Sequence, residues 1–165
     1  MQIPRLVVRT SKRRLQTTST RWPVLAFRWE DMSDRCESND NYVKVLLADD
    51  AAVIRSAVSR LLESEPTIKL VGVAETFSET IEMVATLRPD VVLLDLHMPD
   101  ERTLEPEYIK AQLRPPGSNV RIIGMSLSGN DDEEVRNLGD SLGALTVLEK
   151  SRFYSELIPT ILGRI

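Results

Sequence analysis

From residue 42 onward, short apolar runs alternate with stretches whose apolar positions recur at helical spacing. The short runs are rich in Val, Ile and Leu, and they are largely apolar rather than alternating, which is typical of strands buried on both faces. We expect these strands at residues 43–48, 68–74, 91–94, 120–125 and 144–148. The amphipathic stretches predict helices at residues 52–65, 76–87, 107–113, 131–142 and from 151 toward the end of the chain.

Local signals at helix ends support this pattern. Thr76 and Glu79 have the spacing of a capping box, in which the two side chains satisfy free N–H groups of the first turn. We expect Ser151 to cap the last helix. We also expect Pro159 to interrupt that helix, because proline cannot donate a hydrogen bond to the carbonyl of Ser155.

Strands that alternate with helices predict an α/β fold, with a doubly wound sheet of five parallel strands covered by five helices. In such sheets the functional groups lie beyond the carboxyl ends of the strands. The residues that follow each apolar run are therefore the first candidates for chemistry.

Five polar side chains stand at these positions. Asp49 and Asp50 follow the first strand, Asp95 follows the third, Ser126 follows the fourth and Lys150 follows the fifth. Taken singly, each has a structural interpretation: the first two could favour a helix start, the hydroxyl could be incidental, and the lysine could be a solvated cation. Asp95 is harder to explain in this way, since a carboxylate beside a buried strand is costly without a partner.

As a set these residues indicate phosphoryl chemistry. Three carboxylates brought together repel one another and raise at least one pKa, unless a cation lies among them. Mg²⁺ suits such a cluster because it prefers oxygen ligands and is often completed by a phosphoryl oxygen. With Lys150 and Ser126 placed to contact the other phosphoryl oxygens, the sequence predicts a phosphoryl group accepted on a carboxylate.

Four segments resemble the receiver domain of response regulators in two-component signalling. They are residues 46–50 (LLADD), 91–99 (VVLLDLHMP), 122–126 (IIGMS) and 143–150 (GALTVLEK). The resemblance extends over roughly residues 43–165 and implies a flavodoxin-like sheet with strand order 2-1-3-4-5. It also implies a signalling module that transfers a phosphoryl group to and from itself, rather than an enzyme acting on external substrates.

The resemblance assigns roles to the strand-end residues. Asp95 is similar to the phosphoacceptor, Asp50 to a direct Mg²⁺ ligand and Asp49 to a ligand acting through water. Asp95 itself and the backbone carbonyl of His97 are implied to complete the protein's share of the metal site.

The remaining site residues are implied to read the phosphate. Lys150 is similar to the cation that pairs with Asp95 or its phosphate, and Ser126 to the hydroxyl that moves toward the phosphate on activation. The position that often carries a switch aromatic is Val147 here, so signalling by an aromatic swing is not expected in its usual form.

Three further departures from the family pattern concern loops. Ser151 stands where proline commonly follows the lysine, and residues 100–103 replace a turn that normally contains glycine. Leu127 is bulkier than the small residue often found after the hydroxyl position, and it could slow access of water or donor to the phosphate.

The implied partners are a sensor histidine kinase or phosphotransfer protein as donor and a downstream protein as target, with phosphorylation-dependent dimerisation left open. We recognise no output DNA-binding domain after the receiver segment. The charge distribution agrees with a protein target: seven basic and no acidic residues occupy positions 1–29, so the remainder carries 14 basic against 25 acidic groups, a net charge of −11. Such an acidic domain is poorly suited to contacts with nucleic-acid phosphates.

Residues 1–41 are basic and lack a helical or strand period, so we expect a separate N-terminal arm and a receiver domain at 42–165. Three interpretations of the arm are open: a disordered basic arm, an organellar transit peptide within residues 1–31, or an upstream start codon with Met32 as the working one. We favour the last. A single cysteine, Cys36, and no apolar run of the roughly 20 residues needed to span a bilayer favour a cytoplasmic protein without membrane insertion.

Two other functions are weighed against the signalling switch. An aspartyl-phosphate phosphohydrolase typically carries a second Asp two residues after its nucleophile, whereas this position is His97. A receiver-like scaffold that is never phosphorylated would have no need of the complete set of Asp50, Asp95, Ser126 and Lys150. Both remain alternatives at the level of sequence.

Overall fold

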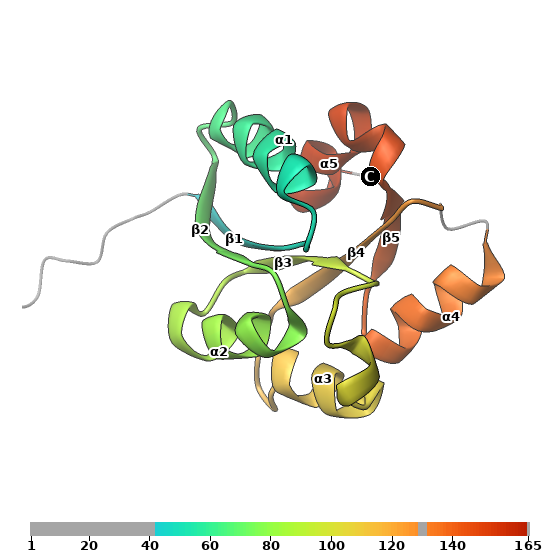
Figure 1. Cartoon of the computed structure of the whole chain (residues 1–165). Coiled ribbons are helices and arrows are strands. Elements are labelled where there is room, and N and C mark those ends of the chain that lie inside the picture. The colour runs from blue at the N-terminus through green and yellow to red at the C-terminus, as the bar shows by residue number, and fades with distance from the viewer. Residues whose placement is uncertain (1–41, 129–131, 165) are drawn as a thin grey trace, which may run out of the picture. The chain divides into compact units, whose positions relative to one another are not determined.

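The computed structural model describes residues 42–128 and 132–164, all within the expected receiver segment. The basic segment 1–41, with Met32, lies outside the described residues. Five parallel strands form one sheet in the order β2-β1-β3-β4-β5 (Figure 1). Their bounds are β1 (Val43–Ala48), β2 (Ile68–Ala74), β3 (Val91–Asp95), β4 (Arg121–Ser126) and β5 (Thr146–Glu149).

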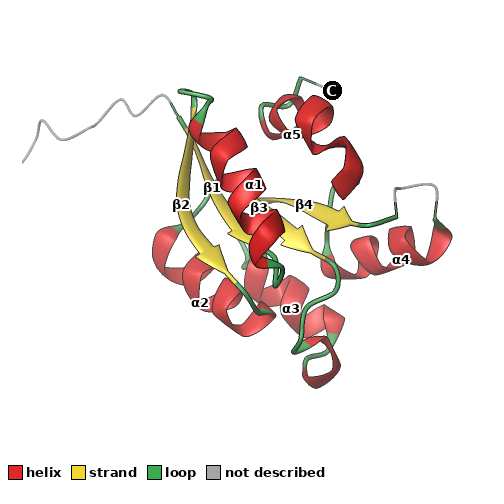
Figure 2. Ribbon diagram, turned by 45° about the horizontal axis from the view of Figure 1, so that its top comes forward, coloured by secondary structure: helices red, strands yellow, loops and turns green. Residues whose placement is uncertain are grey.

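Helices cover both faces of the sheet, with α1 and α5 on one side and α2, α3 and α4 on the other (Figures 1 and 2). The α-helices are α1 (Ala52–Glu63), α2 (Phe77–Leu87), α3 (Pro106–Leu113), α4 (Glu133–Leu142) and α5 (Phe153–Ile161). Two short 3₁₀ helices, η2 (Glu101–Thr103) and η3 (Lys150–Arg152), precede α3 and α5. The predicted fold class and the implied strand order are both confirmed.

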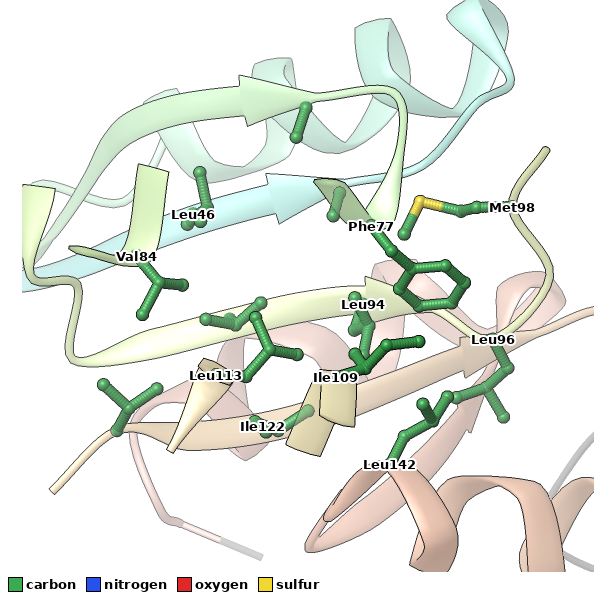
Figure 3. Packing of buried hydrophobic residues seen from close by; sticks show 14 of the residues in the cluster. Leu46, Phe77, Val84, Leu94, Leu96, Met98, Ile109, Leu113, Ile122 and Leu142 are labelled. Carbon is green, nitrogen blue, oxygen red and sulfur yellow. The ribbon is translucent and has the colours of Figure 1, made fainter. Parts of the chain in front are cut away.

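Alternation along the strands divides the core into two layers. In β1, Val45 and Leu47 pack toward α1 and α5, whereas Leu46 packs toward the opposite helices, and all three are fully buried. Figure 3 shows the second layer, where the ring of Phe77 lies near Leu94. Burial on both faces explains the unbroken apolar run of the central strand β3, whereas the edge strand β2 includes the exposed Lys69.

Several predicted boundaries shift by one or two residues. Asp95 and Ser126 are the last residues of β3 and β4 rather than the first residues beyond them. Helix α4 begins at Glu133 instead of 131, because the Asp132 carboxylate caps it by accepting the N–H groups of Glu134 and Val135.

The predicted start of the last helix is wrong. Ser151 does not cap α5: it lies in η3, and its hydroxyl donates to the carboxylate of Glu149. Helix α5 begins only at Phe153, with no side-chain cap at its N-terminus. The expected interruption is also wrong, since α5 contains Pro159 and continues to Ile161; the proline lies close enough to the end that one missing N–H does not break the helix.

The capping box of α2 is present, but one of its two hydrogen bonds goes to a different N–H group. The Thr76 hydroxyl accepts the N–H of Glu79 at 3.1 Å, as predicted. The carboxylate of Glu79 reaches one residue further back than expected, and accepts the N–H of Glu75 at 2.8 Å.

Asp100 supplies a second cap for the same helix from a distant segment. Its carboxylate accepts the N–H groups of Phe77 at 2.8 Å and Ser78 at 2.9 Å, and also the Ser78 hydroxyl at 2.8 Å. These are two of the first-turn N–H groups that a helix cannot satisfy internally. Partial burial by itself raises the pKa of Asp100, but the hydrogen bonds from Ser78 and Phe77 outweigh it and hold the pKa below its ordinary value.

We predict that Asp100→Ala lowers the free energy of unfolding by about 1–2 kcal/mol at neutral pH, the range for loss of a helix cap. Because the folded-state pKa of Asp100 is depressed, its contribution is present above the unfolded pKa and is lost as pH falls through the folded value. The difference between wild type and variant, measured by urea unfolding, should therefore shrink as pH falls below about 4.

Asp140→Ala is the matched control, since Asp140 is exposed and lies near the C-terminal end of α4, where a carboxylate has no capping role. Its effect should stay within about 0.5 kcal/mol. Equal unfolding free energies for wild type and Asp100→Ala at neutral pH would contradict the assigned cap.

Candidate functional site

The carboxyl edge of the sheet brings together all five strand-end residues that the sequence singled out. Asp50, Asp95, Ser126 and Lys150 line one cavity of about 650 Å³, and Asp49 lies beneath it, fully buried. The view in Figure 2 shows β1, β3 and β4 ending at this edge. A parallel sheet accounts for the gathering, because all its strands present their carboxyl ends on the same side.

Lys150 joins two of the carboxylates. Its Nζ lies 2.6 Å from Oδ2 of Asp95 and 2.8 Å from Oδ2 of Asp49. The lysine side chain is only 9% exposed. Burial by itself lowers the pKa of Lys150, but the negative charges of Asp49 and Asp95 and the hydrogen bond to Asp95 outweigh it and raise that pKa above its ordinary value. The ammonium is therefore held in its charged form.

Asp95 sits at the centre of the site with one oxygen toward the lysine and the other toward the backbone. Oδ1 accepts the N–H of His97 at 3.2 Å, and the residue is 4% exposed. Burial raises the pKa of the Asp95 carboxyl, and the opposing effects of Lys150 and His97 only partly offset it. The carboxylate is thus poorly solvated, which favours its use as a nucleophile once a cation is near.

The acidic cluster fits a divalent cation. Asp49, Asp50 and Asp95 each offer a carboxylate oxygen, and these oxygens lie within 4.8 Å of one another. Oδ2 of Asp49 is buried and has no aligned hydrogen-bond donor; its contact with Lys150 has the distance of an ion pair without the angles of a hydrogen bond. An all-oxygen donor set, with a buried carboxylate oxygen that accepts no hydrogen bond, matches the preference of Mg²⁺ for oxygen ligands.

The loop that carries Asp49 and Asp50 is fixed from two sides. Oδ1 of Asp49 accepts the N–H of Ala51 at 2.9 Å, which closes a turn at the end of β1. On the other side, the guanidinium of Arg55 donates to the backbone carbonyls of Asp49 and Asp50. Sequence reasoning missed Arg55, and the only available signal was a basic residue one turn into the helix after the paired aspartates.

His97 lines the same cavity, with its backbone held by Asp95 and its ring exposed. Nδ1 of the ring lies 3.2 Å from Oε2 of Glu101 in η2. The use of its backbone carbonyl as a metal ligand stays a prediction.

Ser126 and Leu127 form the wall toward α4. Ser126 is buried, and its hydroxyl oxygen accepts the N–H of Ser128 at 3.3 Å. The side chain of Leu127 is 82% exposed and lines the same cavity as Asp95.

Val147 occupies a confined position between β4 and α4. It is buried, and a methyl group added to Gly139 would lie 2.7 Å from its Cγ2, while one added to Gly124 would lie 3.1 Å away. Helix α4 thus approaches β5 so closely that an aromatic ring at this position would require the helix to move. The small side chain of Val147, in place of the usual aromatic residue, and the absence of a side chain at Gly139 together permit this close packing.

A family model, described as the response regulator receiver domain, matches residues 45–161. Among curated proteins, a protein-glutamate methylesterase/protein-glutamine glutaminase of Methanosarcina acetivorans is 35% identical over 120 residues, covering 71% of this chain and 32% of that protein. The nitrate/nitrite response regulator NarL of Escherichia coli is 35% identical over 101 residues, covering 61% of this chain and 45% of that protein. The chain therefore spans less than half the length of these relatives.

Solved structures show the same fold. The response regulator domain of CheB from Thermotoga maritima matches with a TM-score of 0.63 and 23% identity, covering 74% of this chain and 95% of that one. The signal receiver domain of NarL from Mycobacterium tuberculosis matches with a TM-score of 0.61 and 24% identity, covering 75% and 99%. Across the described residues, no helix is both long and apolar enough to cross a membrane. With the fold, the acidic edge and the family model in agreement, this chain belongs to the response regulator receiver domain family of two-component signalling.

Proposed function

We propose that the chain is a phosphorylation switch in which Asp95 accepts a phosphoryl group from a phosphohistidine donor. The observation that carries the proposal is the buried Asp95 carboxylate, held by Lys150 on one side and open to a cavity on the other. A solvated surface carboxylate would be stable without a paired lysine. An ion pair with only a structural role would be expected in a closed core rather than at the wall of a cavity.

In the proposed transfer, a carboxylate oxygen of Asp95 forms a bond to phosphorus while the bond from phosphorus to the donor imidazole nitrogen breaks. The imidazole leaves with the electron pair of that bond and takes up a proton. Lys150 already pairs with Asp95, so its charge is in place to balance the phosphoryl oxygens as they arrive. Mg²⁺, when held by Asp49, Asp50 and Asp95 with the carbonyl of His97, would supply further neutralisation of the phosphoryl charge.

The output that we propose is a change of protein-binding surface. Ser126 is placed at the end of β4, where its hydroxyl could exchange its bond with Ser128 for one with a phosphoryl oxygen. A shift there would bias the position of α4, as a local charge change does in other switches. The donor would be a histidine kinase or phosphotransfer protein, and the target a protein in the same cytoplasmic compartment.

A phosphohydrolase acting on external substrates is the weaker candidate. A phosphohydrolase would need a carboxylic acid two residues after Asp95, but this position is His97. Its side chain is 60% exposed and pairs with Glu101. The activity named for the methylesterase relative is not assigned to this chain either, because the match covers only 32% of that protein.

Incubation with acetyl phosphate and Mg²⁺ should add the mass of one phosphoryl group to the wild type, detected by intact mass spectrometry. Asp95→Asn should abolish the adduct because an amide cannot act as the acceptor. Asp140→Asn, which changes an exposed aspartate outside the site, should leave the adduct unchanged. An undiminished adduct on Asp95→Asn would refute the assignment, and many turnovers of an external phosphomonoester would support the phosphohydrolase.

Lys150→Met should slow phosphorylation by acetyl phosphate about 10²–10³-fold, the usual loss when one preorganised charge partner is removed. The physical reason is that Asp49 and Asp95 would then face each other without the ammonium that lies between them. The rate is measured by quenching the reaction at set times and determining the phosphorylated fraction by intact mass spectrometry. Lys110→Met, a change on the exposed side of α3, is the control and should keep the wild-type rate; equal rates for Lys150→Met and wild type would exclude the proposed role.

A further inference from the structure

Arg55, in the first turn and a half of α1, makes contacts that the proposed chemistry does not use. We propose that Arg55 is a positioning residue for the metal site, which fixes the loop of Asp49 and Asp50 in its ion-binding shape before the ion arrives. This inference deepens the proposed function and rests on it to the extent that the acidic cluster binds Mg²⁺.

Three hydrogen bonds carry the inference. Nη1 of Arg55 donates to the carbonyl oxygen of Asp49 at 2.9 Å and to that of Asp50 at 2.7 Å, and Nη2 donates to the carboxylate of Glu75. The Arg55 side chain is only 16% exposed, whereas that of Glu75 is 61% exposed. The two bonds from Nη1 hold the carbonyls of successive residues, and therefore the peptide planes on both sides of Asp50.

Fixing these peptide planes fixes where the carboxylates lie. Asp49 cannot rotate freely, because its Oδ1 is already bound to the N–H of Ala51. With the carbonyl of Asp50 also held, the backbone torsions of Asp50 have little freedom, and its exposed side chain is aimed from a rigid base. This matters most without metal, when carboxylate oxygens within 4.8 Å of one another repel and the loop would otherwise open.

The clamp is itself anchored to α2. Glu75, which receives Nη2 of Arg55, has its own N–H bound by the carboxylate of Glu79. The N–H of Asp49 donates to the carbonyl of Ala74 at 3.1 Å, so the loop after β1 and the loop after β2 are joined at two points. Arg55 thus ties the loop of Asp49 and Asp50, which has no regular secondary structure, to the residue just before α2.

Only arginine has the shape for this task. A guanidinium presents several N–H groups in a planar fork, so it can serve two carbonyls and a carboxylate in fixed directions at once. Lysine keeps the charge and most of the length but presents a single nitrogen on a flexible stem. Arg55→Lys therefore separates the geometric role from the charge.

Isothermal titration of the unphosphorylated full chain with Mg²⁺ tests the inference. We expect Arg55→Lys to weaken Mg²⁺ binding about tenfold, the lower end of the loss seen when groups that orient metal ligands are changed. The control is Arg60→Lys, which makes the same substitution on the exposed surface later in α1 and should keep the wild-type dissociation constant. Thermal unfolding in EDTA should show both variants folded, which separates lost metal affinity from lost structure.

Glu75→Gln provides a second variant if Arg55→Lys does not fold. It removes only the negative charge of the outer partner of the clamp, at a side chain that is 61% exposed, and should weaken Mg²⁺ binding about two- to fivefold, in line with the modest strength of an exposed ion pair. In a chain that carries both changes, the second should add little to the first, since they act through the same contact.

Two outcomes separate this inference from the proposed function. If wild type does not bind Mg²⁺ at all, the proposed metal site fails and the inference fails with it. If wild type binds Mg²⁺, and folded Arg55→Lys and Glu75→Gln bind it with the same dissociation constant, only the positioning role of Arg55 is overturned.

Discussion

The ion pair of Lys150 with Asp49 and Asp95 is the interaction on which the site depends. Two buried carboxylates at the ends of neighbouring strands would repel each other, and the lysine supplies the charge that permits both to remain there. Lys150 follows β5, which is separated from β3 in the sheet by β4. The interaction therefore forms only when β1, β3, β4 and β5 lie side by side in the sheet, so it depends on correct folding of most of the domain.

The first turn of α2 has a comparable part in holding the loops around this pair. Glu75, just before the helix, binds Arg55 and so steadies the loop after β1. Asp100, which lies beyond β3, accepts the N–H groups of Phe77 and Ser78 and so fixes the loop that follows Asp95. The loop after β3 is thus held by free N–H groups of the first turn of α2, where the helix dipole also favours a carboxylate. The loop after β1 is held instead by an ion pair between Arg55 and the residue that precedes the N-cap of α2.

The wall toward α4 has a different character. Here the contact is steric, because Gly139 lets the helix approach Val147 to a distance that no side chain on the helix would permit. A branched aliphatic residue and a glycine together fill the space in which an aromatic side chain would need room to turn. Any response of this chain to phosphorylation is accordingly expected to involve movement of α4 as a body, rather than rotation of a ring beneath it.

The sequence alone was sufficient for the five strands, the fold class and the identity of Asp49, Asp50, Asp95, Ser126 and Lys150 as one group. These follow from local patterns: apolar runs mark buried strands, and parallel strands carry their terminal residues to one edge. The tertiary structure decided the rest, namely the clamp at Arg55, the distant cap at Asp100, the start of α5 beyond Ser151 and the close approach of α4 to Val147. The start of α5 follows from a local hydrogen bond, in which the Ser151 hydroxyl donates to the Glu149 carboxylate. The other three features depend on contacts between segments far apart in the sequence, as with Arg55 and Glu75, which lie 20 residues apart. Periodicity describes one segment at a time, so it carries no information about such contacts.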